Sequence, residues 1–441
     1  MSRSLFHFRH PDRRAFLAAI TLWGGLLAQS SSQVLTLPED NPDPVARAIV
    51  QGAQVISRMA TERYAHQSSM RIIDDKGYVV YQANDGTPQE NAAGQVARLA
   101  IFKLSDPAGT VRWVDISGPG DESGGIKLTG RFVSSPLLHS IDGKTLRCFF
   151  TGKAEGDTLS NERVLYKDYD LATDTLSGLK QVKCVIARKP EESHDLCAVS
   201  VQAHLEHLFG PGAGQKYGRG INPACDFLDI GGVLYSTIQI KNSADGKTLL
   251  MTNVLMRSVD HGATWELLGA PDPEKLATPV KILAEPAISH DAGHVYLHLR
   301  SNVVENGYML SRASKEDLYT FDAPKTVWGY GIGRPNLLAD NAGGGSVALF
   351  TAPTVNTGPQ TLTRNKCDVV QITPGCAEYR RLFSIMDRNA LNTPFMQASG
   401  EEIYIAYSSG RRRLIPKFGT SEIMLSRFNR SAIFPAKSGP L

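Results

Sequence analysis

Six stretches of the chain repeat one pattern of hydrophobic and polar positions. Each begins at a Pro or Ser, called its anchor below, and continues through a short apolar stretch and a polar turn into a β-rich run. The anchors are Ser68, Pro136, Pro223, Pro286, Pro335 and Pro394, and the residues thirteen places further on are Tyr81, Phe149, Ser236, Leu299, Ala348 and Tyr407. Hydroxyl, apolar and aromatic residues alternate in the runs, and Gly or Asp interrupts them, which predicts β-hairpins. The pattern therefore predicts an all-β propeller with six blades, or with seven as the alternative.

A turn motif at residues 258–265 supports the same architecture. These residues read Ser-Val-Asp-His-Gly-Ala-Thr-Trp. Asp260 can bond its own backbone two residues on, Gly262 tolerates a positive φ, and Trp265 can then cover the turn. The motif resembles the Asp-box of sialidase-like β-propellers, where it stabilises the fold away from the active face. Residues 105–113 and 311–318 are weaker copies.

The remaining segments define the domain organisation. The chain has 441 residues with 42% hydrophobic content, 40 Gly and 24 Pro, which suits one large, turn-rich β domain. We predict a signal peptide over residues 1–30, a lead-in over 31–64 and the propeller over 65–441. Within the lead-in, Pro44–Arg63 predicts a short helix that caps the propeller. Cys197–Phe209 predicts an amphipathic helix in an insert before the third copy.

The N-terminus predicts export. Arg13 and Arg14 precede Ala-Phe-Leu and an apolar run from Ala18 to Ala28, which resembles a twin-arginine signal. The apolar run is too short to span a bilayer stably. We expect a secreted or periplasmic protein without a membrane span, exported by the twin-arginine route or by ordinary secretion.

Charge and cysteine content limit the partners and the covalent structure. A net charge of +3 and a pI of about 8.4 are too mild to indicate nucleic acid. A monomer is expected. Six cysteines in an oxidising compartment permit disulfides, and the local pairs would be Cys184 with Cys197 and Cys367 with Cys376, leaving Cys148 with Cys225.

Polar residues gather at one predicted end of the blades. Residues just before an anchor and just after the paired strand lie at that end and converge on the axis. A ring so polar near an axis indicates a functional site. Its candidate members are His66, Gln67, Asp85, Glu285, Arg300, Arg334, Asn392 and Arg411.

The fourth copy resembles the sialidase blade in which a Glu starts the inner strand and an Arg closes the next. The resemblance implies that Arg300 grips a sugar carboxylate and that Glu285 is the base for a tyrosine nucleophile, for which Tyr330 is the candidate by position. Asp85 falls near the place of the general acid. Arg334, or Arg411 within the run 411–413, would supply a further arginine, and Gln67 and Asn392 would also bind substrate.

The first copy departs from the sialidase pattern. Sialidases begin with Arg-Ile-Pro, whereas His66 occupies the arginine's place here. A neutral imidazole can abstract the C5 proton of a uronate and drive β-elimination, as in the propeller families acting on rhamnosyl-glucuronate ends that this chain resembles in this respect. The first hypothesis is a sialidase-like exo-glycosidase acting on a glycan with a terminal acidic sugar. The alternatives are a lyase with His66 as base and a non-catalytic carbohydrate-binding propeller. No cofactor or catalytic metal is predicted, and structural calcium is left open.

Overall fold

The computed structural model describes residues 41–434, with gaps at 59, 91, 130–132, 156–161, 187–191, 219, 242–249, 277–280, 302–306, 330–332, 340–344, 353–363, 365, 388–390 and 413–419. The predicted signal peptide at 1–30 and the first part of the lead-in lie outside this range. No helix among the described residues has the length and hydropathy needed to cross a membrane.

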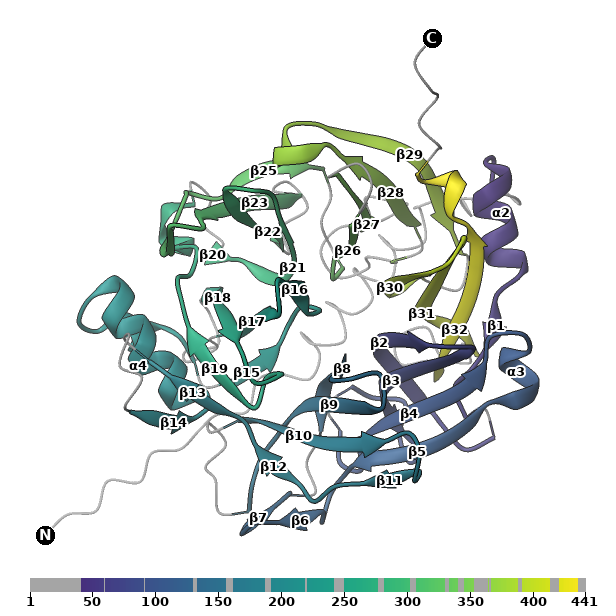
Figure 1. The fold of residues 1–441 in the computed structure, drawn as a ribbon, viewed down its shortest axis with the longest axis horizontal. Coiled ribbons are helices and arrows are strands. Elements are labelled where there is room, and N and C mark those ends of the chain that lie inside the picture. The colour runs from purple at the N-terminus through teal and green to yellow at the C-terminus, as the bar shows by residue number, and fades with distance from the viewer. Residues whose placement is uncertain are drawn as a thin grey trace, which may run out of the picture. The chain divides into compact units, whose positions relative to one another are not determined.

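The described strands form six sheets of four or more strands, arranged around a common axis, and one two-stranded hairpin (Figure 1). The first sheet contains β2 (Tyr64–Ile73), β3 (Lys76–Asn84), β4 (Val96–Lys103) and β5 (Arg112–Ser117). The second contains β8 (Ser134–Ser140), β9 (Thr145–Gly152), β10 (Arg163–Asp170), β11 (Thr175–Leu176) and β12 (Lys180–Gln181). The hairpin is β6 (Glu122–Ser123) with β7 (Ile126–Lys127).

The third sheet is the largest. It contains β13 (Lys183–Val185), β14 (Ser193–Asp195), β15 (Gly220–Pro223), β16 (Leu228–Ile230), β17 (Val233–Lys241), β18 (Leu250–Ser258), β19 (Thr264–Leu267) and β20 (Lys281–Ile282). The fourth contains β21 (Ala284–His290), β22 (His294–Arg300), β23 (Tyr308–Ser314), β24 (Asp317–Phe321) and β25 (Lys325–Trp328).

The last two sheets complete the ring. The fifth contains β26 (Asn336–Ala339), β27 (Ser346–Ala352), β28 (Lys366–Ile372) and β29 (Tyr379–Met386). The sixth contains β30 (Asn392–Ser399), β31 (Glu402–Arg412), β32 (Thr420–Asn429) and β1 (Gln54–Val55). The prediction of an all-β propeller-like fold is confirmed.

The repeat found in the sequence corresponds to the two inner strands of each sheet. Each anchor lies in the innermost strand or directly before it, and the residue thirteen places on lies in the antiparallel strand that pairs with it. Pro can occupy this position because an innermost strand is an edge, where one side of the backbone needs no ladder partner.

Hydrophobic side chains join neighbouring sheets. Each of six buried clusters combines residues from two adjacent sheets. One of these clusters closes the ring by joining the sixth sheet to the first through Met70, Tyr81, Phe395 and Ile423. Each sheet therefore buries both faces, which explains the near-continuous apolar runs in the inner strands.

The N-terminal helix is shorter than predicted. α2 spans Pro44–Gln51, and Asp43 caps it by accepting hydrogen bonds from the amides of Val45 and Ala46 at 2.8 and 3.2 Å. The helix ends at Gly52, and β1 then pairs with β32, so the prediction for residues beyond Gln51 is wrong. The edge of β32 provides backbone partners that replace further helical turns. α2 packs against β29 and β32 on the outside of the ring (Figure 1).

The helical insert agrees with its prediction. α4 (Ala198–Phe209) packs Ala198, Val201 and Leu205 into the core between the second and third sheets. The short α5 (Ala213–Lys216) follows it, and α3 (Pro107–Thr110) connects β4 to β5. Three single-turn helices, η1 (Pro273–Lys275), η3 (Pro374–Cys376) and η4 (Arg430–Ala432), occur among the described residues.

The Asp-box forms the turn between β18 and β19. Ser258 Oγ donates to Asp260 Oδ1 at 2.7 Å and accepts from the Gly262 amide at 2.8 Å, and Asp260 Oδ1 accepts from the Thr264 amide at 2.9 Å. Trp265 is buried beneath the turn. The two weaker copies occupy the equivalent connections, β4 to β5 and β23 to β24.

We expect Asp260→Ala to lower the free energy of unfolding by about 1–2 kcal/mol, because it removes two hydrogen bonds that each contribute about 0.5–1.5 kcal/mol. Chemical denaturation would measure the change. Val259→Ala is the matched control, since this neighbouring side chain is 81% exposed and its truncation should have no effect. Equal stability of the Asp260→Ala variant and the wild type would contradict the structural role.

The predicted disulfides are wrong, because all six cysteines are free. Cys148 lies in the core between the first and second sheets, whereas Cys225 lies between the third and fourth. Cys367 is buried in the core between the fifth and sixth sheets, and the thiol of Cys376 instead contacts His298 Nε2 at 3.7 Å. Cys184 Sγ contacts the Asp195 carbonyl oxygen at 3.7 Å and makes no bond to Cys197.

Candidate active site

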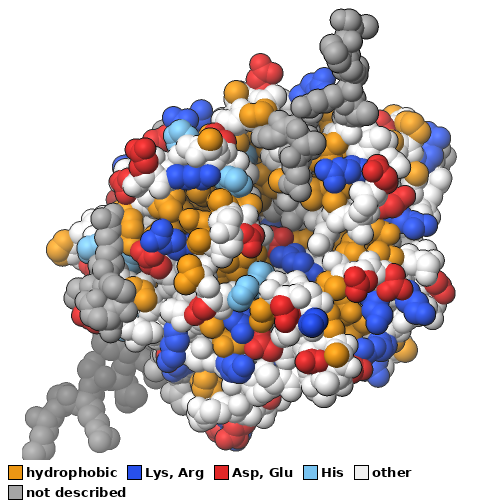
Figure 2. All heavy atoms as spheres, viewed as in Figure 1, with side chains coloured by type: hydrophobic (Ala, Val, Ile, Leu, Met, Phe, Trp, Pro, Cys, Tyr) orange, Lys and Arg blue, Asp and Glu red, His pale blue; other side chains and the backbone are white. Residues whose placement is uncertain are grey.

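The strand order defines two different ends of the ring. In each antiparallel sheet, the start of the innermost strand and the end of its partner lie at one end, and the connection between the third and fourth strands lies at the other. The first end therefore holds the predicted polar ring, and the second holds the Asp-box. Figure 2 shows one face of the molecule, on which basic, acidic and histidine side chains lie among hydrophobic ones around the centre.

The backbone is irregular at the predicted ring. Gln67, Ser135, Glu285 and Thr393 each directly precede an anchor, and each has a positive φ, of 51, 50, 32 and 44° respectively. The strand register shifts at the same four places. Such bulges re-aim a side chain, and positive φ at non-glycine residues is costly and typical of functional sites. The sequence repeat placed these residues together, but nothing in it indicated their strained backbone.

A pocket of about 210 Å³ lies at this end of the axis. Three of the bulge residues, Gln67, Ser135 and Glu285, line it together with Ser134, Gln82, Asn222, Gln239, Lys241 and Arg300. The Gln67 side-chain oxygen accepts hydrogen bonds from Gln82 Nε2 and Ser135 Oγ, both at 3.1 Å. The pocket thus brings together polar side chains from four sheets.

Glu285 and Arg300 form the central ion pair of the pocket. Arg300 Nη1 donates to Glu285 Oε2, and the Glu285 amide donates to Gln239 Oε1 at 2.7 Å. Burial alone would raise the pKa of the Glu285 carboxyl, but the charges of Arg300, Arg334 and Arg364 outweigh it and lower that pKa to about 2. Glu285 is therefore ionised at neutral pH.

Arg334 and Arg364 add positive charge around this pair. Arg334 is buried and donates through Nε and Nη2 to the carbonyl oxygens of Ala224 and Pro223, at 2.9 and 3.3 Å. Arg364 interacts electrostatically with Arg300, Glu285 and Glu90, and burial lowers its pKa. Arg364 could not be found from the repeat, because it precedes β28 at a position that the repeat does not mark.

His66 lies in the same electrostatic field. Its Nδ1 is 2.9 Å from Ser408 Oγ. Burial lowers the pKa of the imidazole, and Arg364 and Arg334 lower it further, while Glu90 and Glu285 oppose the shift. The imidazole is therefore neutral at pH 7, and Ser408 fixes its orientation.

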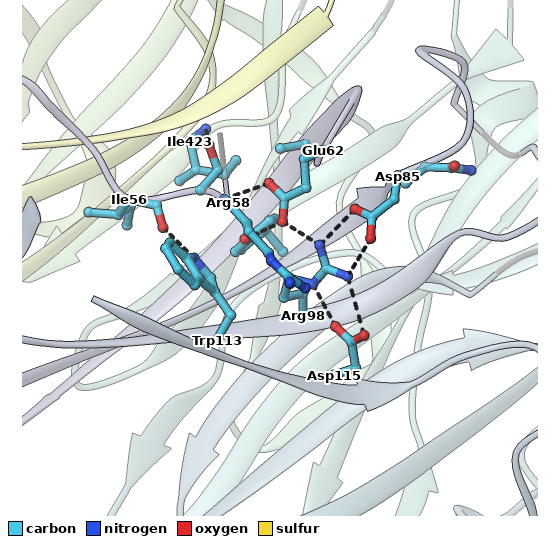
Figure 3. Close-up of polar contacts among 12 residues, drawn as sticks. Ile56, Arg58, Glu62, Asp85, Arg98, Trp113, Asp115 and Ile423 are labelled. Atoms are coloured by element: carbon cyan, nitrogen blue, oxygen red, sulfur yellow. Dashed lines mark hydrogen bonds and ion pairs between the residues drawn. The ribbon is translucent and has the colours of Figure 1, made fainter. Parts of the chain in front are cut away.

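Asp85 does not line the pocket. Its carboxylate accepts hydrogen bonds from Arg98 at 2.9 and 3.2 Å, and Arg98 also binds Glu62 and Asp115 (Figure 3). Glu90, five residues further along, lines the pocket and lies 3.5 Å from Gln67 Nε2.

The other predicted residues are placed only in part. Asn392 pairs with Ser408 at the start of β30, beside the bulge at Thr393. Arg411 is in β31, but its side chain is outside the described residues, as is the whole of Tyr330. Within the described chain, no group of three His, Cys, Asp or Glu side chains is suited to hold a metal ion.

Several buried polar atoms at this end of the ring lack a hydrogen-bond partner among the described residues. They are Tyr64 Oη, Gln82 Oε1, Thr151 Oγ1, Asn222 Oδ1, Arg300 Nε, Asn392 Oδ1 and Thr393 Oγ1. A buried polar atom left unpaired costs about 1–3 kcal/mol, so such a concentration requires an explanation. A polar ligand or ordered water in the pocket would satisfy these atoms.

Comparison with known proteins supports the fold. No family model and no curated protein matches the chain. Among solved structures, it is similar to the Hadza microbial sialidase Hz136, with 13% identity and a TM-score of 0.59 over 86% of this chain and 69% of that one. It is also similar to Trypanosoma rangeli sialidase in complex with sialic acid, with 12% identity and a TM-score of 0.56 over 85% of this chain and 59% of that one.

A third similar structure is a protein of unknown function from Dyadobacter fermentans, with 13% identity and a TM-score of 0.55 over 86% of this chain and 99% of that one. The chain spans only 53–59% of the Trypanosoma rangeli sialidase chains. The predicted resemblance to sialidase-like β-propellers is confirmed for the fold. At this identity the likeness carries no information about activity.

Proposed function

We propose that this chain is an exported carbohydrate-active enzyme whose six sheets are six propeller blades, and which removes a terminal acidic sugar from a glycan by sialidase-like hydrolysis. The observation that carries the proposal is the group of three arginines, Arg300, Arg334 and Arg364, around Glu285. Glu285 and Glu90 balance at most two of these three positive charges, which leaves cationic capacity for a sugar carboxylate. Planar guanidinium groups suit this ligand because they donate two parallel hydrogen bonds.

In this proposal Arg300 and Arg364 bind the carboxylate of the sugar, and Arg334 contributes its charge from a fixed position. Arg300 Nε is buried and lacks a partner among the described residues, so it is ready to donate. Glu285 accepts the proton of the nucleophile, for which Tyr330 remains the candidate. Glu90 replaces Asp85 as the proton donor to the leaving oxygen, because it is the carboxyl of that connection which reaches the pocket.

We expect Glu90→Gln to lower kcat/KM by about 10²–10⁴-fold on glycosides with poor leaving groups, the usual contribution of a general acid. Aryl glycosides with good leaving groups need no protonation and should lose far less. Steady-state kinetics on both substrate types would measure the difference. Asp85→Asn is the matched control from the same connection and should leave kcat/KM unchanged, and a uniform loss with Glu90→Gln on both substrates would contradict the assignment.

A second candidate function is β-elimination at a uronate, favoured by the neutral, oriented imidazole of His66. Here His66 removes the C5 proton while arginine neutralises the carboxylate. The two reactions differ in their products, because elimination leaves an unsaturated uronate that absorbs in the ultraviolet and hydrolysis does not.

If His66 is the base, the acid limb of the kcat/KM profile should lie below pH 6.5. A base acts in its neutral form, and a lowered pKa keeps His66 neutral to lower pH. Initial rates measured by ultraviolet absorbance between pH 4 and 8 would locate the limb, because this range extends on both sides of the ordinary imidazole pKa of about 6.5. An acid limb above pH 6.5, or a profile unchanged in His66→Gln, would exclude His66 as the base.

The proposed function is tested by incubating the full chain with sialosides, uronosides and rhamnosyl-glucuronate glycans. Release of a free acidic sugar without new ultraviolet absorbance supports hydrolysis, and new absorbance supports elimination. Binding without turnover of any of the three classes would replace both with a non-catalytic carbohydrate-binding propeller.

A further inference from the structure

A second and larger cavity, of about 820 Å³, lies on the axis toward the end that holds the Asp-box. Residues that follow the anchors line it, among them Arg71, His139, Asp226, Tyr296, Leu337 and Gln397. Of the residues assigned to the candidate active site, only Arg334 also lines this cavity. Its volume falls within the roughly 300–1,000 Å³ typical of small-molecule sites.

Carboxylates outnumber arginines in this cavity, which is lined by Arg71, Arg334, Asp226, Asp229 and Asp291. Arg71 Nη2 and Nη1 donate to the two carboxylate oxygens of Asp226, at 2.6 and 3.3 Å. Tyr296 donates to Asp291 Oδ2 at 2.5 Å. Burial lowers the pKa of His139 to about 3, so its imidazole is neutral at pH 7. The cavity therefore lacks the excess of arginine that marks the other end, and a neutral ligand fits it better than an acidic one.

Both aromatic side chains and polar groups line the cavity. Phe227 is half-buried, and its ring is held against Phe149 and Trp265, with centroids 5.1 and 6.1 Å apart. Arg71 lies over the ring of Phe395 at 5.9 Å. Gln397 Oε1 is buried and has no hydrogen-bond partner among the described residues, so it can accept from a ligand hydroxyl. Sugars offer C–H faces for aromatic rings and hydroxyls that both donate to Asp226 and accept from Arg71.

We propose that this cavity is a second carbohydrate site, which binds a neutral oligosaccharide. Apart from Arg334, its lining differs from that of the candidate active site, and so do its charge and its ligand. Binding there does not require that the chain be an enzyme.

Isothermal titration calorimetry with the full chain tests this site, using cellotriose, maltotriose and xylotriose as neutral probes and trigalacturonate as the acidic probe. We expect at least one neutral trisaccharide to bind. Leu337→Trp fills the cavity with a larger side chain and should weaken that binding at least tenfold. Gln397→Ala, which removes the unpaired acceptor, should also weaken it and serves as the second variant if Leu337→Trp does not fold.

Arg300→Met, at the opposite end, is the control and should leave binding of the neutral trisaccharide unchanged. Absence of binding by all three neutral trisaccharides would overturn the proposal. So would equal affinity in the wild type and both cavity variants, or binding of trigalacturonate alone. Thermal unfolding of each variant would establish that it is folded before titration.

Discussion

Arg98→Met should lower the free energy of unfolding by about 3–5 kcal/mol, the cost of removing one partner from a buried ion pair. Arg98 and Glu62 have side chains only 3 and 2% exposed, and their charged atoms are 2.7 Å apart (Figure 3). Burial raises the pKa of the Glu62 carboxyl, and Arg98 counteracts this. Without Arg98, Glu62 must either remain charged and uncompensated or take up a proton.

Chemical denaturation of wild type and variant would measure this loss. Arg312→Met is the control, because Arg312 and Asp322 are 45 and 63% exposed and such a pair contributes about 0–1 kcal/mol. Adding Glu62→Gln to Arg98→Met should restore part of the stability, since it removes the buried charge. A loss no larger than that of Arg312→Met would show that the network of Figure 3 has little structural importance.

Arg300→Met should lower kcat/KM on the acidic substrate by about 10²–10³-fold, the usual effect of removing one preorganised group that stabilises charge. Arg300 is the arginine paired directly with Glu285, so the variant loses a carboxylate ligand and leaves Glu285 to interact with Arg334 and Arg364 alone. Lysine should not restore activity, because a single ammonium group cannot make the two parallel bonds of a guanidinium.

Arg147→Met provides the matched control for Arg300→Met. Arg147 also forms a largely buried ion pair, with Asp168 at 2.8 Å, but it donates to the backbone of the Asp-box turn. This variant should be less stable and keep its kcat/KM per folded molecule. Equal kinetic losses in both variants would mean that Arg300 acts only through stability.

The arrangement of strands could be predicted because one side-chain pattern recurs at every inner hairpin. Within each copy, the strand at the anchor pairs with the strand that contains the residue thirteen places further on, so this pairing is local. The arrangement of the six sheets around an axis then follows from the repetition of this unit. The sheet interfaces also follow, since strands buried on both faces read as continuous apolar runs.

Details of the site could not be predicted, because they depend on competition between nearby groups. Asp85 and Glu90 lie in one connection, and only the structure shows that Arg98 binds Asp85 and leaves Glu90 for the pocket. The helix expected up to Arg63 ends at Gly52 because a distant strand, β32, offers backbone partners to Gln54 and Val55. Cysteine spacing was likewise uninformative, since it does not show which core each thiol enters.

Because β1 pairs with β32, the sixth sheet can be completed only near the end of synthesis. Gln54 pairs with Leu425, so β1 has no partner until some 370 further residues have been synthesised. This synthesis takes about 20–75 s at the usual 5–20 residues per second. During translation β1 therefore lacks its partner strand. A chain released from a ribosome that stalled before β32 would have an incomplete sixth sheet, with β31 as an unpaired edge. Such a product is a natural substrate for chaperones and quality-control proteases.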